Sequence, residues 1–579
     1  MNNIEELVNK KAQIWLNGNY DQETKLAVQK MIDSSDKTEL IDSFYQDLEF
    51  GTGGLRGIMG VGSNRMNKYT VGMATQGLAN YLKISFPSQQ IKMAIAYDCR
   101  NNSKYFSEIA AAVLSANDIY VYLFENLRPT PELSFAIRHL NCQSGIVITA
   151  SHNPKEYNGF KAYWNDGAQL IAPHDVNVIA EVQKISSIDD VKMNKKSELI
   201  TMIGKDIDEL YLEKVCQLSL TPEAIKNQHN LKIVYTPIHG TGRELVPTCL
   251  TKMGFTNINL ITEQMEADGN FPTVKSPNPE ESAALNLALI KAKEIDADIV
   301  LATDPDADRV GVAIKDNKGE FILLNGNQTC ALITNYLLTR WSEKNLLKGK
   351  EFIIKTIVTS ELVKTIADGF NVKSFNVLTG FKFIAQIIRE QEGKMQFIGG
   401  GEESYGYLIS DFVRDKDAVS ACAIIAEMTA WAKDQNLSVY DNLIQMYMKF
   451  GYYRESLLSI TKKGKTGADE IQQMMKDFRQ FPPKMLNNSM ISKICDYQNQ
   501  TEFDVKNNIV NAISQPKSNV LQFYTEDGTV TSIRPSGTEP KIKFYFGVKA
   551  ELTSPNDFDA VTQKLDDKIN TIIEELKLR

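Results

Sequence analysis

The sequence predicts an α/β protein: three repeated α/β domains with mainly parallel sheets, then a C-terminal α+β domain, with four loops meeting in a central cleft. Three observations lead to this prediction. The chain of 579 residues is too long for one hydrophobic core. A strand–helix–strand–helix–strand pattern recurs three times along it. From about residue 451 this pattern gives way to a helical stretch and a hairpin.

Each repeat begins with an apolar run that reads as a covered strand. The three runs are IKMAIAY from Ile91, LKIVYT from Leu231 and EFIIKTIV from Glu351. A helical stretch and a second strand follow each of them. A third strand then comes in each repeat, and these third strands are SGIVITA, ADIVLAT and MQFIGG. This order predicts parallel sheets with right-handed crossovers.

The two ends of the chain differ from the repeats. Residues 1 to ~50 are expected to be helical, with Asp21 and Ser35 suited to capping. In the tail, VLQFYTEDGTVTSI predicts a hairpin that turns at Asp527-Gly528, and the last twenty residues predict an amphipathic helix. We interpret residues 188–206 as a linker. The predicted domains are 1–205, 206–325, 326–450 and 451–579.

Composition is that of an ordinary globular protein, with 43% hydrophobic and 23% charged residues. A formal net charge of −8 argues against a general nucleic-acid binder. The seven cysteines form no CxxC pair, which fits a reducing compartment. No signal peptide is visible, and no apolar run approaches the ~20 residues of a membrane span. We therefore expect a cytoplasmic protein without a nucleic-acid or membrane partner. A monomer or dimer is expected, although these observations do not bear on the oligomeric state.

Each third strand runs into a polar cluster, and ligands bind beyond the carboxyl ends of such strands. The first cluster is TASHNP, in which Ser151 is either a turn residue that bonds nearby backbone groups or a nucleophile. A serine-hydrolase triad is rejected because the sequence has no GxSxG elbow. The adjacent His152 is expected to point elsewhere.

The second cluster is DPDADR, which crowds Asp304, Asp306 and Asp308 together. Three carboxylates at alternate positions are costly unless a cation compensates them, and oxygen ligands indicate Mg²⁺ or Ca²⁺. An EF-hand is excluded, since Arg309 and Lys315 stand where its glycine and glutamate belong. A phosphatase that uses Asp304 as nucleophile stays open.

Two further loops carry polar side chains that suit a polyol in one case and a phosphate in the other. GEESYGY offers Glu402, Glu403 and Ser404 to a polyol, although an ordinary polar turn explains this loop better when it is taken alone. RPSGTEPK offers Arg534 as a bidentate phosphate clamp, with Ser536, Gly537, Thr538 and Lys541 around it. KKGKTG is not a Walker A loop, because Ser459 replaces its first glycine.

Taken in order, TASHNP, DPDADR, GEESYGY and RPSGTEPK resemble the phosphoserine, metal, sugar and phosphate loops of the α-D-phosphohexomutase superfamily. The resemblance covers nearly the whole chain. GTGGLRG, LTGFKF and the N-terminal extension look most like the phosphoglucomutase-2 and phosphopentomutase branch. Tyr405-Gly406 after the sugar-loop serine favours glucose phosphates over amino sugars.

This resemblance implies an enzyme that interconverts glucose 1-phosphate and glucose 6-phosphate. Ser151 would carry a phosphoryl group, share Mg²⁺ with the three aspartates and exchange its phosphate through glucose 1,6-bisphosphate. The resemblance also implies roles for further residues. Arg309 and Lys161 would flank the transferring group, Arg56 and His152 would line the phosphoserine, Thr379, Glu402, Ser404 and Lys416 would contact the sugar, and Arg534, Ser536, Gly537 and Thr538 would hold the distal phosphate.

Several alternatives stay open at this point. Pentose or mannose phosphates could replace glucose as substrate. A phosphatase that uses Asp304 would release free phosphate and would not need Ser151. A non-catalytic phosphosugar-binding relative would retain the loops without turnover. The general base is unassigned, with Lys161 and His152 as candidates.

Overall fold

The computed structural model describes residues 2–51, 54–462, 464–536 and 541–579. The chain divides into two compact units. Unit 1 comprises residues 1–324, 388–390 and 406–434, and unit 2 comprises residues 325–387, 391–405 and 435–579. Among the described residues, no helix has the length and apolar character needed to cross a membrane. The predicted division into four domains stays a prediction.

Unit 1 begins with helices, as the sequence predicts: α1 (Asn2–Asn17), α2 (Gln22–Asp33) and α3 (Thr38–Phe44). Asp21 caps α2, because its side chain accepts a hydrogen bond of 2.7 Å from the amide of Thr24. Ser35 does not cap α3. That helix starts at Thr38, whose amide donates a hydrogen bond to the carboxylate of Asp36. Trp15 on α1 and Phe44 on α3 pack edge to face within one buried hydrophobic cluster.

The first sheet of unit 1 has the strand order β1-β5-β4-β2-β3-β6. Its strands are β1 (Gly54–Ile58), β2 (Lys92–Tyr97), β3 (Tyr120–Phe124), β4 (Ser144–Ile148), β5 (Tyr157–Trp164) and β6 (Ile200–Ile203). Its helices are α4 (Lys68–Ser85), α5 (Ser103–Ala116), α6 (Thr130–His139) and α7 (His174–Gln183). The three predicted strands and the helix between the first two are confirmed. Residues 188–206 are not simply a linker, because β6 adds to the sheet in parallel beside β3.

The second sheet of unit 1 has the order β11-β10-β9-β7-β8. Its strands are β7 (Ile233–Thr236), β8 (Ile258–Leu260), β9 (Ile299–Thr303), β10 (Val310–Lys315) and β11 (Phe321–Leu324). The helices of this part are α8 (Lys205–Cys216), α9 (Pro222–Asn227), α10 (Gly242–Met253), α11 (Thr262–Met265) and α12 (Asn286–Ile295). Strand β15 (Tyr407–Ile409) and the buried helix α16 (Ala418–Asp434) also belong to unit 1.

The chain reverses after the third strand in both sheets of unit 1. Strand β5 runs antiparallel to β4, and β10 runs antiparallel to β9. The sheets are therefore mixed around a parallel centre, a feature that the strand–helix repeat did not predict. Each polar cluster consequently lies in a short β–β connection whose two ends are both held by the sheet.

Unit 2 contains the third repeat. Strand β12 lies between its parallel neighbours β13 and β14. The elements are α13 (Gly326–Glu343), β12 (Glu351–Thr356), α14 (Glu361–Gly369), β13 (Lys373–Val377), α15 (Phe381–Gln391), β14 (Gln396–Gly401) and α17 (Val439–Phe450). These elements confirm the predicted order of the third repeat.

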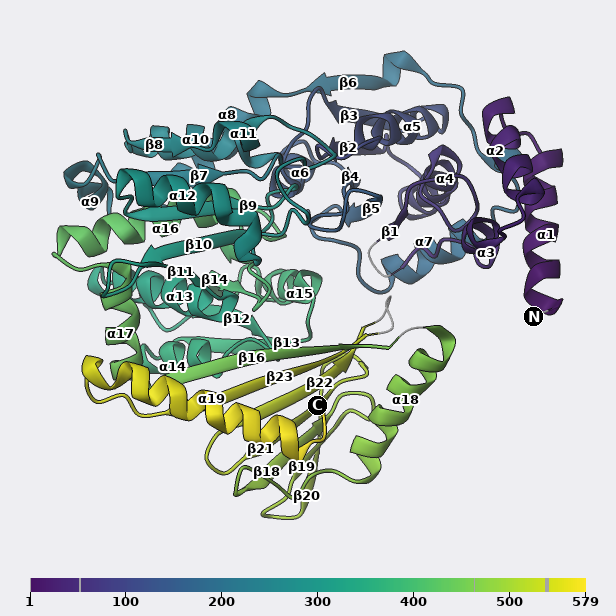
Figure 1. The fold of residues 1–579 in the computed structure, drawn as a ribbon. Coiled ribbons are helices and arrows are strands. Elements are labelled where there is room, and N and C mark those ends of the chain that lie inside the picture. Colours follow the sequence, from purple (N-terminus) through teal and green to yellow (C-terminus); the bar gives the residue numbers. More distant parts are fainter. Residues whose placement is uncertain (1, 52–53, 463, 537–540) are drawn as a thin grey trace. The chain divides into compact units, whose positions relative to one another are not determined.

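The tail is an antiparallel sheet of order β16-β23-β22-β21-β18-β19-β20, with helix α19 lying across it (Figure 1). Its elements are β16 (Tyr452–Thr461), α18 (Gly464–Gln480), β17 (Met485–Leu486), β18 (Ser489–Asp496), β19 (Thr501–Asp504), β20 (Ile509–Ala512), β21 (Leu521–Thr525), β22 (Val530–Pro535), β23 (Lys541–Ala550) and α19 (Phe558–Glu575). The hairpin at Asp527-Gly528 is confirmed, because β21 and β22 pair around it and Gly528 adopts a φ of 83°. Strand β16 and strands β17–β20 were not predicted.

Unit 2 also carries a titratable group away from the polar loops. The hydroxyl of Ser360 donates to the carboxyl of Glu455 on β16. Burial raises the pKa of Glu455 from an ordinary 4.5 to about 7. Between pH 4.5 and about 7, the folded chain keeps a proton on Glu455 that the unfolded chain has released. The stability contributed by this group is therefore lost as pH rises through that range.

We expect the free energy of unfolding of the wild type to fall by about 2–3 kcal/mol between pH 5 and pH 8 on account of Glu455. Glu455→Gln should remove this part of the pH dependence, because the amide does not titrate. Urea unfolding at both pH values measures the difference, with the exposed Glu551→Gln as control. An unchanged pH dependence in Glu455→Gln would contradict the assignment.

Candidate active site

The Ser151 loop connects the buried strand β4 with its antiparallel neighbour β5. Ser151 is buried and has a φ of 51°, in the left-handed region that non-glycine residues adopt at a cost. Its amide donates to the hydroxyl of Thr149 at 2.8 Å. The loop thus turns Ser151 away from the direction of β4, just beyond the carboxyl end of that strand.

The hydroxyl of Ser151 donates to Oδ2 of Asp304 at 2.6 Å. This bond joins the first and second polar clusters, 153 residues apart in sequence. Nδ1 of His152 lies 3.2 Å from the same hydroxyl, so the expectation that His152 points elsewhere is wrong. The left-handed turn at Ser151 allows two adjacent side chains to meet. Burial, with Arg309 and Arg56 nearby, holds the pKa of His152 well below its ordinary value.

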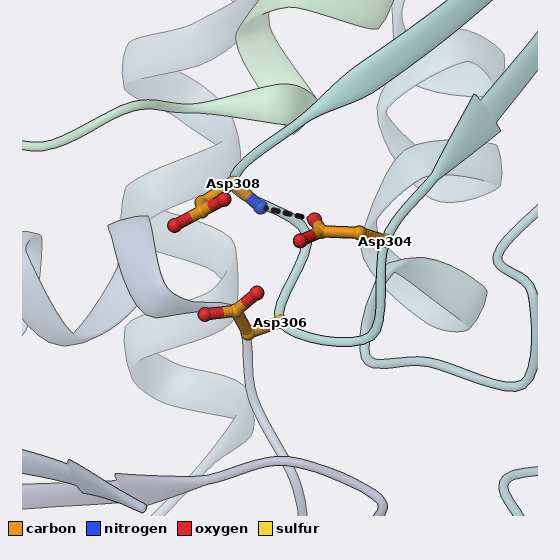
Figure 2. A group of neighbouring side chains, drawn as sticks. All are labelled: Asp304, Asp306 and Asp308. Carbon is orange, nitrogen blue, oxygen red and sulfur yellow. Dashed lines mark hydrogen bonds between the residues drawn. The ribbon is translucent and has the colours of Figure 1, made fainter. Parts of the chain in front are cut away.

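The acidic loop is the connection between β9 and β10. The side chains of Asp304, Asp306 and Asp308 are buried and gather at one bend of the chain (Figure 2). Their ligand atoms all lie within 4.8 Å of one another. Oδ1 of Asp304 accepts from the amides of Asp308 and Arg309 at 3.1 and 3.0 Å, which ties the loop back on itself.

Two ammonium groups compensate part of this charge. Lys161 on β5 lies 2.8 Å from Asp306 and 3.5 Å from Asp308. Lys416, which precedes α16, lies 3.1 Å from Asp308 and 3.1 Å from Asp415. Lys416 was predicted as a sugar contact, and the structure brings it to the acidic loop.

The carboxyl groups of the acidic loop are electrostatically unequal. Burial, together with the charges of Asp306 and Asp308, raises the pKa of Asp304 well above its ordinary value. Burial has the same tendency at Asp306, but the ammonium of Lys161 lowers the pKa of Asp306 below its ordinary value. Burial would lower the pKa of Lys161, yet the carboxylates of Asp306 and Asp308 raise it. Charge in this loop therefore depends on the cations beside it.

The acidic loop suits a hard divalent cation. Oδ1 of Asp306 and Oδ1 of Asp308 are buried and accept no hydrogen bond from the described part of the chain. Buried carboxylate oxygens that accept no hydrogen bond are costly, and Mg²⁺ prefers oxygen ligands. The donor set therefore fits the predicted metal.

Two arginines border the serine. Nη1 of Arg309 lies 2.6 Å from Glu280, and Arg309 Nε lies 3.8 Å from Asp308. The solvent-exposed Arg56 on β1 makes a long hydrogen bond of 3.4 Å to the side chain of Asn153. Both arginines thus lie in unit 1 with Ser151, as do His152, Lys161 and Lys416.

Sequence reasoning missed three residues of this site. Thr130 at the start of α6 donates to Oδ2 of Asp306 at 3.0 Å. Glu280 pairs with Arg309, and Asp415 accepts from Tyr163 at 2.7 Å. Asp415 lies beside Lys416 in the charged stretch RDKDAV, which could have indicated it. Thr130 begins a helix and Glu280 lies in a turn, and neither has a distinctive local pattern.

Residues 401–405 of the GEESYGY loop lie in unit 2, and Gly406 and Tyr407 lie in unit 1. Oε1 of Glu402 accepts from the amide of Gly380 at 2.8 Å, which joins this loop to the Thr379 segment. The buried hydroxyl of Thr379 has no hydrogen-bond partner within the described chain. Ser404 is half-buried. Glu403 is instead structural, since its Oε2 accepts from Thr356 and Thr359.

The RPSGTEPK loop also belongs to unit 2. Arg534, half-buried near the end of β22, hydrogen-bonds the side chain of Tyr545 on β23. Burial raises the pKa of Tyr545, with the charge of Glu403 adding to it. The amide of Ser536 donates to the carbonyl of Lys541 at 2.7 Å, which closes the base of the loop. Gly537 and Thr538 lie outside the described residues.

Comparison with known proteins gives matches along most of the chain. Residues 47–189, 209–319 and 325–447 match the alpha/beta/alpha domains I, II and III of phosphoglucomutase/phosphomannomutase, and residues 497–553 match its C-terminal domain. A phosphoglucomutase of Staphylococcus aureus is 38% identical over 529 residues, covering 91% of this chain and 93% of the relative. One from Staphylococcus haemolyticus is 36% identical over 538 residues, covering 93% and 96%.

Solved structures show the same fold at lower identity. The phosphoglucomutase pp63/parafusin of Paramecium has a TM-score of 0.68 at 18% identity, covering 91% of this chain and 96% of that one. A phosphoglucomutase/phosphomannomutase family protein of Burkholderia thailandensis has a TM-score of 0.65 at 17% identity, covering 91% and 97%.

These matches define the class of protein as an intramolecular phosphotransferase, an enzyme of the isomerase type. Within that class, the chain belongs to the phosphoglucomutase/phosphomannomutase family.

Proposed function

We propose that this protein is a phosphoglucomutase, which interconverts glucose 1-phosphate and glucose 6-phosphate through a phosphoserine at Ser151 and glucose 1,6-bisphosphate. The observation that carries the proposal is the 2.6 Å bond from the Ser151 hydroxyl to Asp304, inside a buried set of three carboxylates. The curated relatives bearing the name phosphoglucomutase support glucose phosphates as substrate.

In the proposed reaction the Ser151 O–P bond breaks while a bond forms between phosphorus and a sugar hydroxyl oxygen, whose proton passes to a base of the protein. The bisphosphate then reorients within the site, and its other phosphoryl group is transferred to Ser151. Arg309 and Lys161 supply positive charge where the phosphoryl oxygens develop negative charge. His152, with its lowered pKa, is a neutral acceptor next to the serine oxygen and is our candidate base.

Asp304, Asp306 and Asp308, together with the phosphate on Ser151, would hold Mg²⁺. When bound, Mg²⁺ withdraws charge from the phosphoryl oxygens as a Lewis acid. The protein's own part is to keep three carboxylates in place, through the amides that bond Asp304 and through Thr130, which bonds Asp306.

We assign sugar contacts to Thr379, Glu402, Ser404 and Lys416, and distal phosphate contacts to Arg534, Ser536, Gly537 and Thr538. The unpartnered hydroxyl of Thr379 beside Glu402 supports the first assignment. We further propose four domains, 1–205, 206–325, 326–450 and 451–579, each of which carries one of the four loops. A cytoplasmic monomer or dimer that acts on small phosphosugars, without nucleic-acid or membrane partners, completes the proposal.

A phosphatase that uses Asp304 as nucleophile is disfavoured by the contacts of that carboxylate. One oxygen accepts two backbone amides and the other accepts the Ser151 hydroxyl. Both oxygens are thus engaged by the protein, and the Ser151 hydroxyl stands at the oxygen that the backbone amides leave available. These contacts favour Ser151 over Asp304 as the nucleophile.

A coupled assay tests the proposal by comparing glucose 1-phosphate with mannose 1-phosphate and with ribose and deoxyribose 1-phosphates. We expect glucose 6-phosphate as product, no net release of inorganic phosphate, and higher kcat/KM for glucose 1-phosphate than for the other sugars. Turnover confined to pentose phosphates would replace glucose as substrate, and stoichiometric phosphate release would replace the mutase with a phosphatase.

Arg534→Ala should weaken the hold on the distal phosphate. A charge-assisted bidentate bond contributes roughly 1.5–3 kcal/mol, so KM for glucose 1-phosphate should rise about 10- to 150-fold. The bisphosphate should also escape more often, so that added glucose 1,6-bisphosphate partly restores the rate. Steady-state kinetics with and without the bisphosphate measures both effects.

Arg479→Ala is the matched control, because Arg479 is another half-buried arginine of unit 2 that bonds Asp496 and Asn519 instead of a candidate phosphate. We expect this control to keep the wild-type KM. A wild-type KM in Arg534→Ala, with no added dependence on the bisphosphate, would remove Arg534 as the distal clamp.

A further inference from the structure

Arg100 lies beneath the Ser151 loop, at the bend that follows β2, and its side chain is buried. Its Nη1 donates to the carbonyls of Pro154 at 2.8 Å and Tyr157 at 3.1 Å. Its Nη2 donates to the carbonyl of Ser151 at 2.5 Å and to that of Asn153. One guanidinium thus gathers four carbonyl oxygens of a single loop.

The guanidinium of Arg100 is also held by groups outside the Ser151 loop. Its Nε lies 3.4 Å from Oδ2 of Asp98, and both side chains are fully buried. Oδ1 of Asp98 accepts from the amide of Arg100 at 2.9 Å and from the hydroxyl of Ser103 at 2.6 Å. The ring of Phe271 covers the guanidinium, whose central carbon lies 5.1 Å from the ring centroid.

The backbone around Arg100 leaves little room for movement. A Cβ on Gly269 would lie 2.3 Å from the amide nitrogen of Asn101, so the chain at residue 269 fits closely against the Arg100 segment. Both segments belong to unit 1. The position of Arg100 is therefore set by the core, independently of the loop that it bonds.

We propose that Arg100 is a positioning residue that holds the Ser151 loop in its reactive shape. Carbonyl groups of a loop do not converge on one point unless a donor collects them, because their dipoles repel. Ser151 occupies a left-handed backbone conformation, which needs such external support. That conformation directs the hydroxyl to Asp304 and brings His152 beside it.

Arginine suits this task and lysine does not. The guanidinium presents five N–H donors in a rigid plane, whereas an ammonium presents three on a flexible stem. Arg100→Lys keeps the charge that faces Asp98 but cannot reach all four carbonyls. The loop should then leave its shape for part of the time, while the side chains that would bind substrate remain unchanged.

The kinetic part of the test rests on the proposed mutase activity. A displacement of the reacting group by about 1 Å costs roughly 10²-fold in rate, so kcat of Arg100→Lys should fall about 10²-fold. KM for glucose 1-phosphate should stay within about threefold of the wild type, since no proposed substrate contact is removed. A smaller fraction of active enzyme would also lower the apparent kcat at an unchanged KM, so kcat is calculated per folded protein and is interpreted together with the exchange measurement below.

A second readout does not depend on activity. Within the loop, the amide of Asn153 donates to Ala150 and that of Tyr157 donates to Pro154. Amide hydrogen exchange of a peptide spanning residues 150–157 should be at least about tenfold faster in Arg100→Lys than in the wild type. Should the wild type prove inactive on every sugar phosphate, the proposed function fails, and exchange alone decides the role of Arg100.

Arg65→Lys is the matched control, because Arg65 is also buried in unit 1 but pairs with Glu39 instead of the loop. If Arg100→Lys does not fold, Asp98→Asn takes its place, since it loosens the ion pair while keeping the shape. It should change kcat and loop exchange in the same direction by a smaller factor. The proposal is overturned if the folded variant matches Arg65→Lys in both loop exchange and kcat.

Discussion

Ser151→Ala should lower kcat for glucose 1-phosphate by roughly 10⁴-fold or more, because the reaction loses the atom that carries the phosphoryl group between the two ends of the sugar. The hydroxyl lies 2.6 Å from Asp304, and no other described serine makes that contact. Mass spectrometry of the peptide that contains Ser151 should show a phosphate in the wild type after incubation with glucose 1,6-bisphosphate. The variant should show none.

Ser144→Ala is the control for this experiment. Ser144 begins β4, the strand that leads into the Ser151 loop, is also buried, and donates its hydroxyl to the carbonyl of Tyr163 at 2.6 Å. Its loss should affect stability and leave the phosphorylation of Ser151 intact. A phosphatase that attacks with Asp304 would keep most of its rate in Ser151→Ala, and that result would sink the phosphoserine mechanism.

Asp306→Asn should lower kcat by roughly 10³-fold, because it removes one of the three carboxylates that would hold Mg²⁺. The substitution also removes the negative charge nearest to Lys161, whose ammonium lies 2.8 Å from the carboxylate of Asp306 in the wild type. We expect the remaining activity to need a higher Mg²⁺ concentration. Rates measured across a Mg²⁺ titration, for wild type and variant, give both quantities.

Asp208→Asn is the matched control for this variant, because Asp208 is another buried carboxylate of unit 1 and bonds Arg128 at 2.7 and 2.9 Å. It should lose stability without any change in the Mg²⁺ requirement. Wild-type activity in an excess of chelator would refute the metal site, whatever the variants show.

Much of this site could be predicted from local sequence. The runs SGIVI and IVLAT are entirely buried strands, and Ser151 and Asp304 follow them at the edge of their sheets. An apolar run is legible because burial on both faces of a strand acts on every residue of that run. The acidic alternation in DPDADR is equally legible, because three neighbouring carboxylates repel one another wherever they lie.

Other features could not be predicted from local sequence. The side chain of His152 bonds Ser151 only because the backbone of Ser151 turns into the left-handed region. Residues 200–203 form a strand because β3 offers an open edge beside them, although their own pattern resembles a linker. Local composition does not encode either circumstance.

By itself, the sequence determined the three recurring strands of each repeat, the hairpin of the tail and the chemistry of each polar loop. These depend on hydrophobic periodicity and on charges a few residues apart. The tertiary structure alone decided which distant groups meet: Arg100 with four carbonyls of the Ser151 loop, Glu280 with Arg309, and Lys416 with Asp308. Such contacts join segments up to about a hundred residues apart. They form because the sheet order sets strands β2, β4 and β5 side by side, and because buried charges must find partners wherever packing brings them.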